Sequence, residues 1–107
     1  MSENQPAEIT QILLEWNNGD VEAGERLLPF VYKELKRNAR FLMSGERSNH
    51  TLQPTALVHE AFLKLTELNE IKWQNRSHFY RFVSHLMRQV LVDYARSHAA
   101  AKRGSAA

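Results

Sequence analysis

The chain has 107 residues and no cysteine. This length supplies one modest hydrophobic core and leaves little room for a barrel or a dinucleotide-binding sheet, while the lack of Cys excludes disulfides and thiolate metal sites. The net charge of +2 hides a division, because residues 1–71 hold seven Lys or Arg and eleven Asp or Glu, whereas residues 72–107 hold seven Lys or Arg and one acid, Asp93. That asymmetry suggests an anionic partner for the basic end, although a solvated basic helix face gives the same pattern.

The first half of the chain predicts two helices, over residues 8–17 and 21–43. Gly19 can supply the left-handed residue that ends the first helix, and Asp20 can cap the second. Gly24 would let another helix approach closely, and Pro29 predicts a kink or a break. The expected core positions recur at helical spacing. They are Ile9, Ile12, Leu13, Trp16, Val21, Leu27, Leu28, Val31, Leu35, Ala39 and Leu42.

The second half predicts two further helices, separated from each other by a loop at residues 69–76. One follows a polar loop (Gly45–Leu52), begins near Pro54 and runs to about Leu68; the other is capped by Ser77 and runs to about His98. Arg81, Arg88 and Arg96 lie within one quarter of the last helix and form a basic ridge. The expected core positions are Leu57, Val58, Ala61, Phe62, Leu65, Leu68, Phe79, Phe82, Val83, Leu86, Met87, Val90, Leu91 and Tyr94.

These elements predict an all-α fold. We expect a compact bundle of three main helices plus a short N-terminal helix, forming a single domain over residues 1–107 with about 99–107 frayed or disordered. No segment is long and apolar enough to span a membrane, so no membrane partner is expected.

The outer face of the third helix carries an incomplete metal motif. His59 and Glu60 begin a zinc-protease pattern, but Leu63 stands where the second His is needed, so neither a metal, a cofactor nor an enzymatic activity is expected. Leu63 itself fits a scattered surface leucine, which the pattern alone favours, or the knob of a docking face ringed by charges.

The loop and the last helix combine basic and aromatic residues. Cations hold phosphates, and aromatic faces can carry unstacked bases, so the mixture suits single-stranded or melted DNA. The alternative is that Trp73 packs at the edge of the core and the arginines serve solubility. Composition leaves the two open.

Three segments resemble the extracytoplasmic-function (ECF-like) branch of the bacterial sigma-70 family. They are TALVHEAFLKL at 55–65, W-x-N-R-x-HFY at 73–80 and MRQVLVDYARSHAAAKRG at 87–104. The resemblance implies the second conserved region of a sigma factor, a cytoplasmic helical domain that docks on the β′ clamp coiled coil of RNA polymerase. It also implies recognition and melting of the −10 element of promoter DNA through the non-template strand. An anti-sigma factor is a further partner that it would allow.

The resemblance assigns two sets of site residues. Its docking motif matches His59, Glu60, Leu63, Lys64 and Glu67 as polymerase contacts. Its promoter-reading part matches the loop and the last helix, where residues 72–77 would receive a flipped base. The DNA-binding candidates are Lys72, Trp73, Asn75, Arg76, Tyr80, Arg81, His85, Arg88, Gln89, Val92 and Arg96.

Two departures from the family stand out. His85 and Leu86 occupy the place of a tryptophan pair that primary sigma factors use as a strand-separating wedge. The helix-turn-helix domain that reads the −35 element in the family is absent from these 107 residues. A helical protein–protein adaptor without nucleic-acid binding remains the alternative function.

Overall fold

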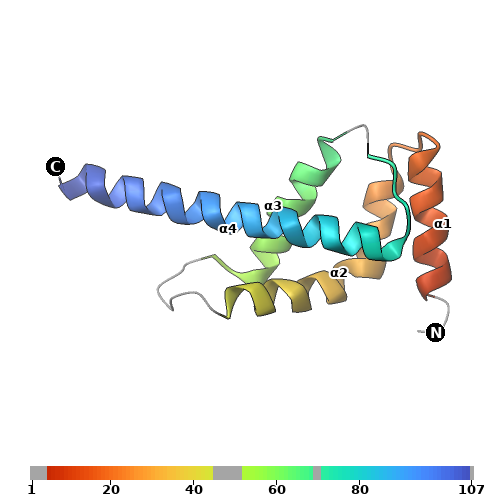
Figure 1. Ribbon diagram of the computed structural model, residues 1–107, viewed down its shortest axis with the longest axis horizontal. Coiled ribbons are helices and arrows are strands. Elements are labelled where there is room, and N and C mark those ends of the chain that lie inside the picture. The colour runs from red at the N-terminus through yellow and green to blue at the C-terminus, as the bar shows by residue number, and fades with distance from the viewer. Residues whose placement is uncertain (1–4, 45–51, 69–70, 107) are drawn as a thin grey trace.

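Helix α4 forms the long axis of the molecule, and three shorter helices pack beside its first half (Figure 1). The computed structural model describes residues 5–44, 52–68 and 71–106, with side chains between residues 7 and 97 of those ranges. Its elements are α1 (Gln5–Asn17), α2 (Ala23–Met43), α3 (Pro54–Thr66) and α4 (Arg76–Ala106). The described residues contain no strand and form four helices, so the predicted all-α bundle is confirmed. The N-terminal helix is not shorter than the others, because α1 and α3 both have 13 residues.

One hydrophobic cluster joins all four helices. The side chains that are fully enclosed include Leu27 and Leu35 of α2, Leu57 of α3, and Phe79 and Met87 of α4. These lie at the apolar positions that helical spacing predicts, and their removal from water stabilises the bundle at about 25 cal/mol per Å² of apolar surface.

Two expected core residues are instead exposed. Val21 is 88% exposed and Leu68 is 43% exposed. Val21 precedes the first residue of α2, and Leu68 follows the last residue of α3. Because both residues lie outside their helices, the helical periodicity that directs the other apolar side chains into the core does not apply to them. Both predictions were wrong.

The α1–α2 corner is built by Gly19, Asp20 and Arg26. Gly19 has φ +101°, the left-handed conformation expected of it. The Asp20 carboxylate accepts a hydrogen bond from the N–H of Glu22 at 3.0 Å, so it closes the turn just before α2 rather than capping the helix itself. Arg26 donates to Asp20 at 2.9 Å and to Glu15 of α1 at 2.6 Å.

The Arg26 hydrogen bond, with help from the Glu22 N–H, lowers the pKa of the Asp20 carboxyl. Because the folded pKa is the lower one, this contribution to stability is present above the unfolded pKa and is lost as the pH falls through the folded value. The site is exposed, so salt weakens the effect.

Pro29 lies inside α2 without ending it. Proline removes one backbone N–H from the helix and crowds the preceding turn, which bends a helix. Figure 1 shows that α2 changes direction between its orange and yellow parts, so the expected kink is confirmed.

Helix α4 begins one residue before the predicted cap at Ser77. The Asn75 side chain accepts the N–H of His78 at 2.8 Å, so Asn75 rather than Ser77 provides the cap. The helix continues to Ala106, past the expected end near His98. The expected loop at 45–52 falls outside the described residues except for Leu52.

Gly24 generates a stability prediction. A Cβ at this position would lie 3.0 Å from the Trp16 ring, which confirms that glycine permits the close approach of α1. Gly24→Val should therefore lower the free energy of unfolding by about 1–3 kcal/mol through overpacking, measured by urea denaturation. Ala95→Val, on the exposed surface of α4, is the control and should cost well under 1 kcal/mol. Equal losses in the two variants would contradict the packing account.

Candidate functional site

The segment that leads into α4 is fastened to the end of α1 by Asn17. The Asn17 amide donates to the Trp73 carbonyl at 2.8 Å, and its side-chain oxygen accepts the Trp73 N–H at 2.7 Å. Lys72 adds a third bond, from its ammonium to the Asn17 carbonyl at 2.9 Å. We call the two Asn17–Trp73 hydrogen bonds the loop clamp. It fixes the backbone immediately before α4.

Trp73 anchors the same loop through its side chain. The indole is 5% exposed and lies between Trp16 of α1 and Phe82 of α4, with ring centroids 5.6 and 5.5 Å away. His78 and Phe79 also contact it, at 5.3 and 5.2 Å. Aromatic rings at such distances stabilise one another beyond the burial of their surface. The loop is therefore held by its side chain as well as by its backbone.

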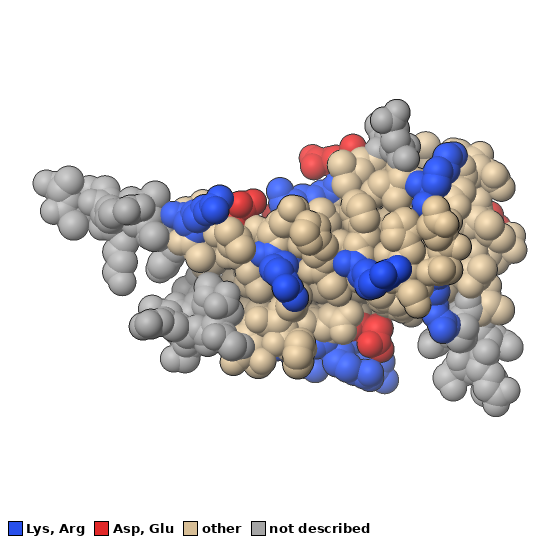
Figure 2. Space-filling view, viewed as in Figure 1, with Lys and Arg blue, Asp and Glu red and all other residues tan. Residues whose placement is uncertain are grey.

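The outward side of α4 presents a row of exposed side chains, all of them polar except Val92. Figure 2 shows basic groups spaced along the face that carries α4, with few acidic groups among them. We call this row the α4 face. Its members are Arg81, His85, Arg88, Gln89, Val92 and Arg96, all of them exposed.

The three arginines of the α4 face form no ion pair with any described residue. His85 and Gln89, one turn apart, contact each other at 3.2 Å. The face therefore offers free guanidinium groups over several turns of one rigid helix, which is an arrangement that can hold a row of phosphates.

The outward side of α3 forms a second exposed surface of different character. We call it the α3 face, and it comprises His59, Glu60, Leu63 and Lys64 of the helix together with Glu67, the residue that follows it. Leu63 is 63% exposed. Beside it lies an open groove of about 450 Å³ between α2 and α3, whose surface is mainly apolar. The lining residues are Glu25, Leu28, His59, Phe62, Leu63 and Thr66.

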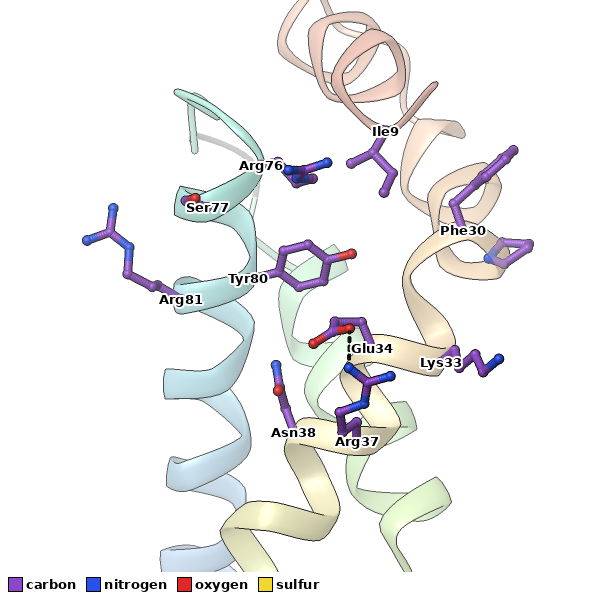
Figure 3. Close-up of a pocket in the computed structure, with 11 residues that line it drawn as sticks. Ile9, Phe30, Lys33, Glu34, Arg37, Asn38, Arg76, Ser77, Tyr80 and Arg81 are labelled. Atoms are coloured by element: carbon purple, nitrogen blue, oxygen red, sulfur yellow. Dashed lines mark hydrogen bonds and ion pairs between the residues drawn. The ribbon is translucent and has the colours of Figure 1, made fainter. Parts of the chain in front are cut away.

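A larger cavity, of about 770 Å³, opens between the kinked α2 and the start of α4. We call it the α2–α4 cavity. Figure 3 shows Tyr80 and Arg76 of α4 directed into it from one side and Glu34 and Asn38 of α2 from the other. Burial raises the pKa of the Tyr80 phenol, with a further rise from Glu34 that Arg76 opposes.

A comparison of the sequence with protein families identifies the family of the chain. Residues 6–107 match the model of the family described as ECF sigma factor. The chain belongs to the ECF sigma factor family. No curated protein and no solved structure matched it in the other two comparisons. Membership gives this sigma domain a non-catalytic role in transcription initiation, with the RNA polymerase core and promoter DNA as partners.

The sigma domain brings most of the sequence-predicted DNA residues to one side of α4, but three serve the fold. Trp73 is enclosed in the aromatic cluster, so it offers no face to an unstacked base. Asn75 caps α4, and Lys72 reaches back to α1. Arg76 and Tyr80 line the α2–α4 cavity rather than the α4 face.

Lys33, Arg37 and Asn38 were predicted from the sequence to belong to no site, yet all three line the α2–α4 cavity. The sequence feature that could have indicated this site is the basic outer face of the second helix, because packing of the helix does not require these cations. The cavity itself depends on the bend of α2 and could not be found from helical spacing.

Two findings bear on other kinds of site. No group of three or more metal-binding side chains occurs within the described part of the sigma domain. None of its described helices is long and apolar enough to cross a membrane.

The loop clamp generates a second prediction. Asn17→Ala leaves the Trp73 N–H and carbonyl without partners at a partly buried place, and should lower the free energy of unfolding by about 1–3 kcal/mol in thermal or urea denaturation. Asn18→Ala is the matched control, because Asn18 is exposed and forms only backbone hydrogen bonds. An Asn17→Ala variant as stable as Asn18→Ala would show that the clamp does not hold the loop.

Proposed function

We propose that this sigma domain docks on the β′ clamp coiled coil through the α3 face and holds the non-template strand of the −10 element on the α4 face, where it helps melt the promoter. The observation that carries the proposal is the separation of two chemically different exposed surfaces onto two helices of one rigid bundle. Membership of the ECF sigma factor family supplies the partners.

The α3 face suits a helical protein partner. The opposite side of α3 is already buried, with Leu57, Val58 and Leu65 enclosed in the core. Leu63 is therefore apolar surface that the fold itself does not use. An exposed apolar knob beside an apolar groove and ringed by charged groups resembles the core and rim of a protein interface. Glu60, Lys64 and Glu67 would form the rim.

The α4 face suits a phosphate backbone. Its arginines are unpaired among the described residues and project from a helix whose other side is fixed in the core by Phe79, Val83 and Met87. Rigid placement lowers the entropy lost when a strand binds. The adaptor alternative leaves these aligned arginines without a role, whereas a strand of DNA uses them.

The position of the family's strand-separating wedge differs here. Leu86 is 7% exposed and belongs to the core, while His85 is exposed on the α4 face. One imidazole has less surface to insert between bases than two indoles. We infer that this domain contributes less to promoter melting than a primary sigma factor does. It would therefore depend more on a close match between the promoter and the sequence that it recognises.

The proposal predicts a crossed pattern of two variants. Leu63→Ala should weaken binding to a β′ clamp coiled-coil peptide by about tenfold or more, because it removes the apolar knob, and should leave binding of single-stranded DNA unchanged. Arg88→Ala should weaken binding of a −10 non-template oligonucleotide severalfold, more at low salt, and leave clamp binding unchanged. Fluorescence anisotropy with each labelled partner measures both.

Matched controls separate site effects from general ones. Leu14→Ala removes another half-exposed leucine, on α1, and should preserve clamp binding. Lys64→Ala removes one positive charge from the α3 face and should preserve DNA binding. Two outcomes would contradict the assignment of the two faces. In one, Leu63→Ala or Arg88→Ala loses clamp binding and DNA binding together; in the other, both variants keep both activities.

A further inference from the structure

The outer side of α2 carries a basic surface that belongs to neither the α3 face nor the α4 face. Residues 30–44 hold four cations and one acid, Glu34. That acid contacts Arg37 at 3.2 Å, yet the Arg37 side chain remains 70% exposed. Lys33 and Arg40 are exposed and form no ion pair with any described residue. The helix therefore presents more positive charge than the fold itself neutralises.

Two aromatic side chains flank these cations. Phe41 is 78% exposed near the C-terminal end of α2, and Phe30 is half-buried one turn before Lys33. Positions 30, 33, 37, 40 and 41 recur at the spacing that places side chains on one side of a helix. We call this surface the α2 stripe. Its members are Phe30, Lys33, Arg37, Arg40 and Phe41.

The α2 stripe is distinct from the surface assigned to DNA. Phe30, Lys33 and Arg37 also line the α2–α4 cavity. Figure 3, however, shows the side chains of Phe30 and Lys33 directed away from Tyr80 of α4. The stripe shares no residue with the α4 face or the α3 face, so it stays accessible when both of those faces are occupied.

The arrangement of the stripe fits a helical partner. The row extends about 16 Å along one helix axis, and side chains three and four residues apart on a second helix can meet it position by position. Carboxylates on that second helix would form charge-assisted hydrogen bonds with the three cations. An apolar side chain at each end would cover Phe30 and Phe41.

The composition of the stripe favours a protein over a membrane. Arginine and aromatic residues are enriched at protein interfaces and among the residues that contribute most to binding. An amphipathic helix that lies on a lipid surface needs a broad apolar face, whereas the stripe offers only two separated rings.

We propose that the α2 stripe binds an acidic amphipathic helix of a partner protein. Lys33, Arg37 and Arg40 pair with its carboxylates, and Phe30 and Phe41 pack against its apolar residues. This interaction goes beyond the proposed function and does not depend on it.

The test uses the whole chain, labelled with ¹⁵N, and two synthetic helix-forming peptides of equal composition. The first carries three glutamates on one helix face, with a leucine at each end of that face. The second has the same residues with the glutamates and leucines distributed around the helix. We expect the first peptide to shift the amide signals of residues 30–44, and the second to shift them much less.

Variants make the test quantitative, with fluorescence anisotropy of the labelled first peptide as the readout. Phe41→Ala should weaken binding about tenfold through loss of apolar contact. Leu14→Ala removes another half-exposed apolar side chain, on α1, and should leave binding unchanged. Arg40→Ala should weaken binding severalfold. Lys36→Ala makes the same change of charge on α2 and should have a smaller effect, because Lys36 is half-buried over the Tyr32 ring.

Three outcomes would overturn the proposal. Equal binding of the two peptides, with equal effects of Phe41→Ala and Leu14→Ala, would show general charge attraction. Shifts confined to residues 85–96 would place the peptide on the α4 face. A stripe that binds oligodeoxythymidine or phosphatidylglycerol vesicles more tightly than the first peptide, with Phe41→Ala weakening that binding, would belong to nucleic acid or to a membrane.

The same variants keep this inference separate from the proposed function. Phe41→Ala and Arg40→Ala should leave binding of the β′ clamp peptide unchanged, since neither residue belongs to the α3 face. Loss of clamp binding in either variant, with the fold intact by circular dichroism, would contradict the independence of the two surfaces.

Discussion

Asn17 and Trp73 join the end of α1 to the start of α4, and the α4 face depends on that junction. The two hydrogen bonds of the loop clamp fix the backbone of Trp73, while its indole is packed among Trp16, His78, Phe79 and Phe82. Because a helix is rigid, fixing its first turn also fixes the rotation of every later side chain about its axis. The buried loop tryptophan thus holds the first turn of a helix whose rotation is also fixed by Phe79, Val83 and Met87 in the core.

The division of charge along the chain acquires a spatial meaning in this fold. The basic second half supplies the α4 face, and the more acidic first half supplies the α3 face with Glu60 and Glu67. The separation is incomplete, since Lys33 and Arg37 of α2 stand across the cavity from α4. A sigma domain that binds a protein and a nucleic acid gains specificity when the two sites lie on different helices. The phosphates of DNA are then repelled by the acidic groups of the α3 face, and a basic protein partner is repelled by the arginines of the α4 face.

Local rules predicted much of this fold. The spacing of Leu27, Leu35 and Leu57 marked the core, Gly19 marked a helix end and Pro29 marked a bend, because each depends on a few neighbouring residues. Val21 and Leu68 were misplaced because the pattern does not show where a helix begins or ends to within a residue or two. The exposed faces of the last two helices also followed from periodicity.

Contacts between distant residues could not be predicted in the same way. Asn17 and Trp73 are 56 positions apart, and nothing in the residues around either one signals their pairing. Trp73 was a candidate for base stacking by residue type, whereas its actual place depends on how α1 and α4 pack. The α2–α4 cavity likewise requires the direction that α2 takes after Pro29.

Amide hydrogen exchange at Trp73, followed by NMR in the unmodified protein, tests the central claim most directly. The account holds that the loop before α4 is fixed by the Asn17 side chain, so the Trp73 N–H should exchange orders of magnitude more slowly than an unprotected amide, at a rate near that of the core amides of α4. Exchange of the Trp73 N–H at the unprotected rate, while the α4 core stays protected, would contradict it.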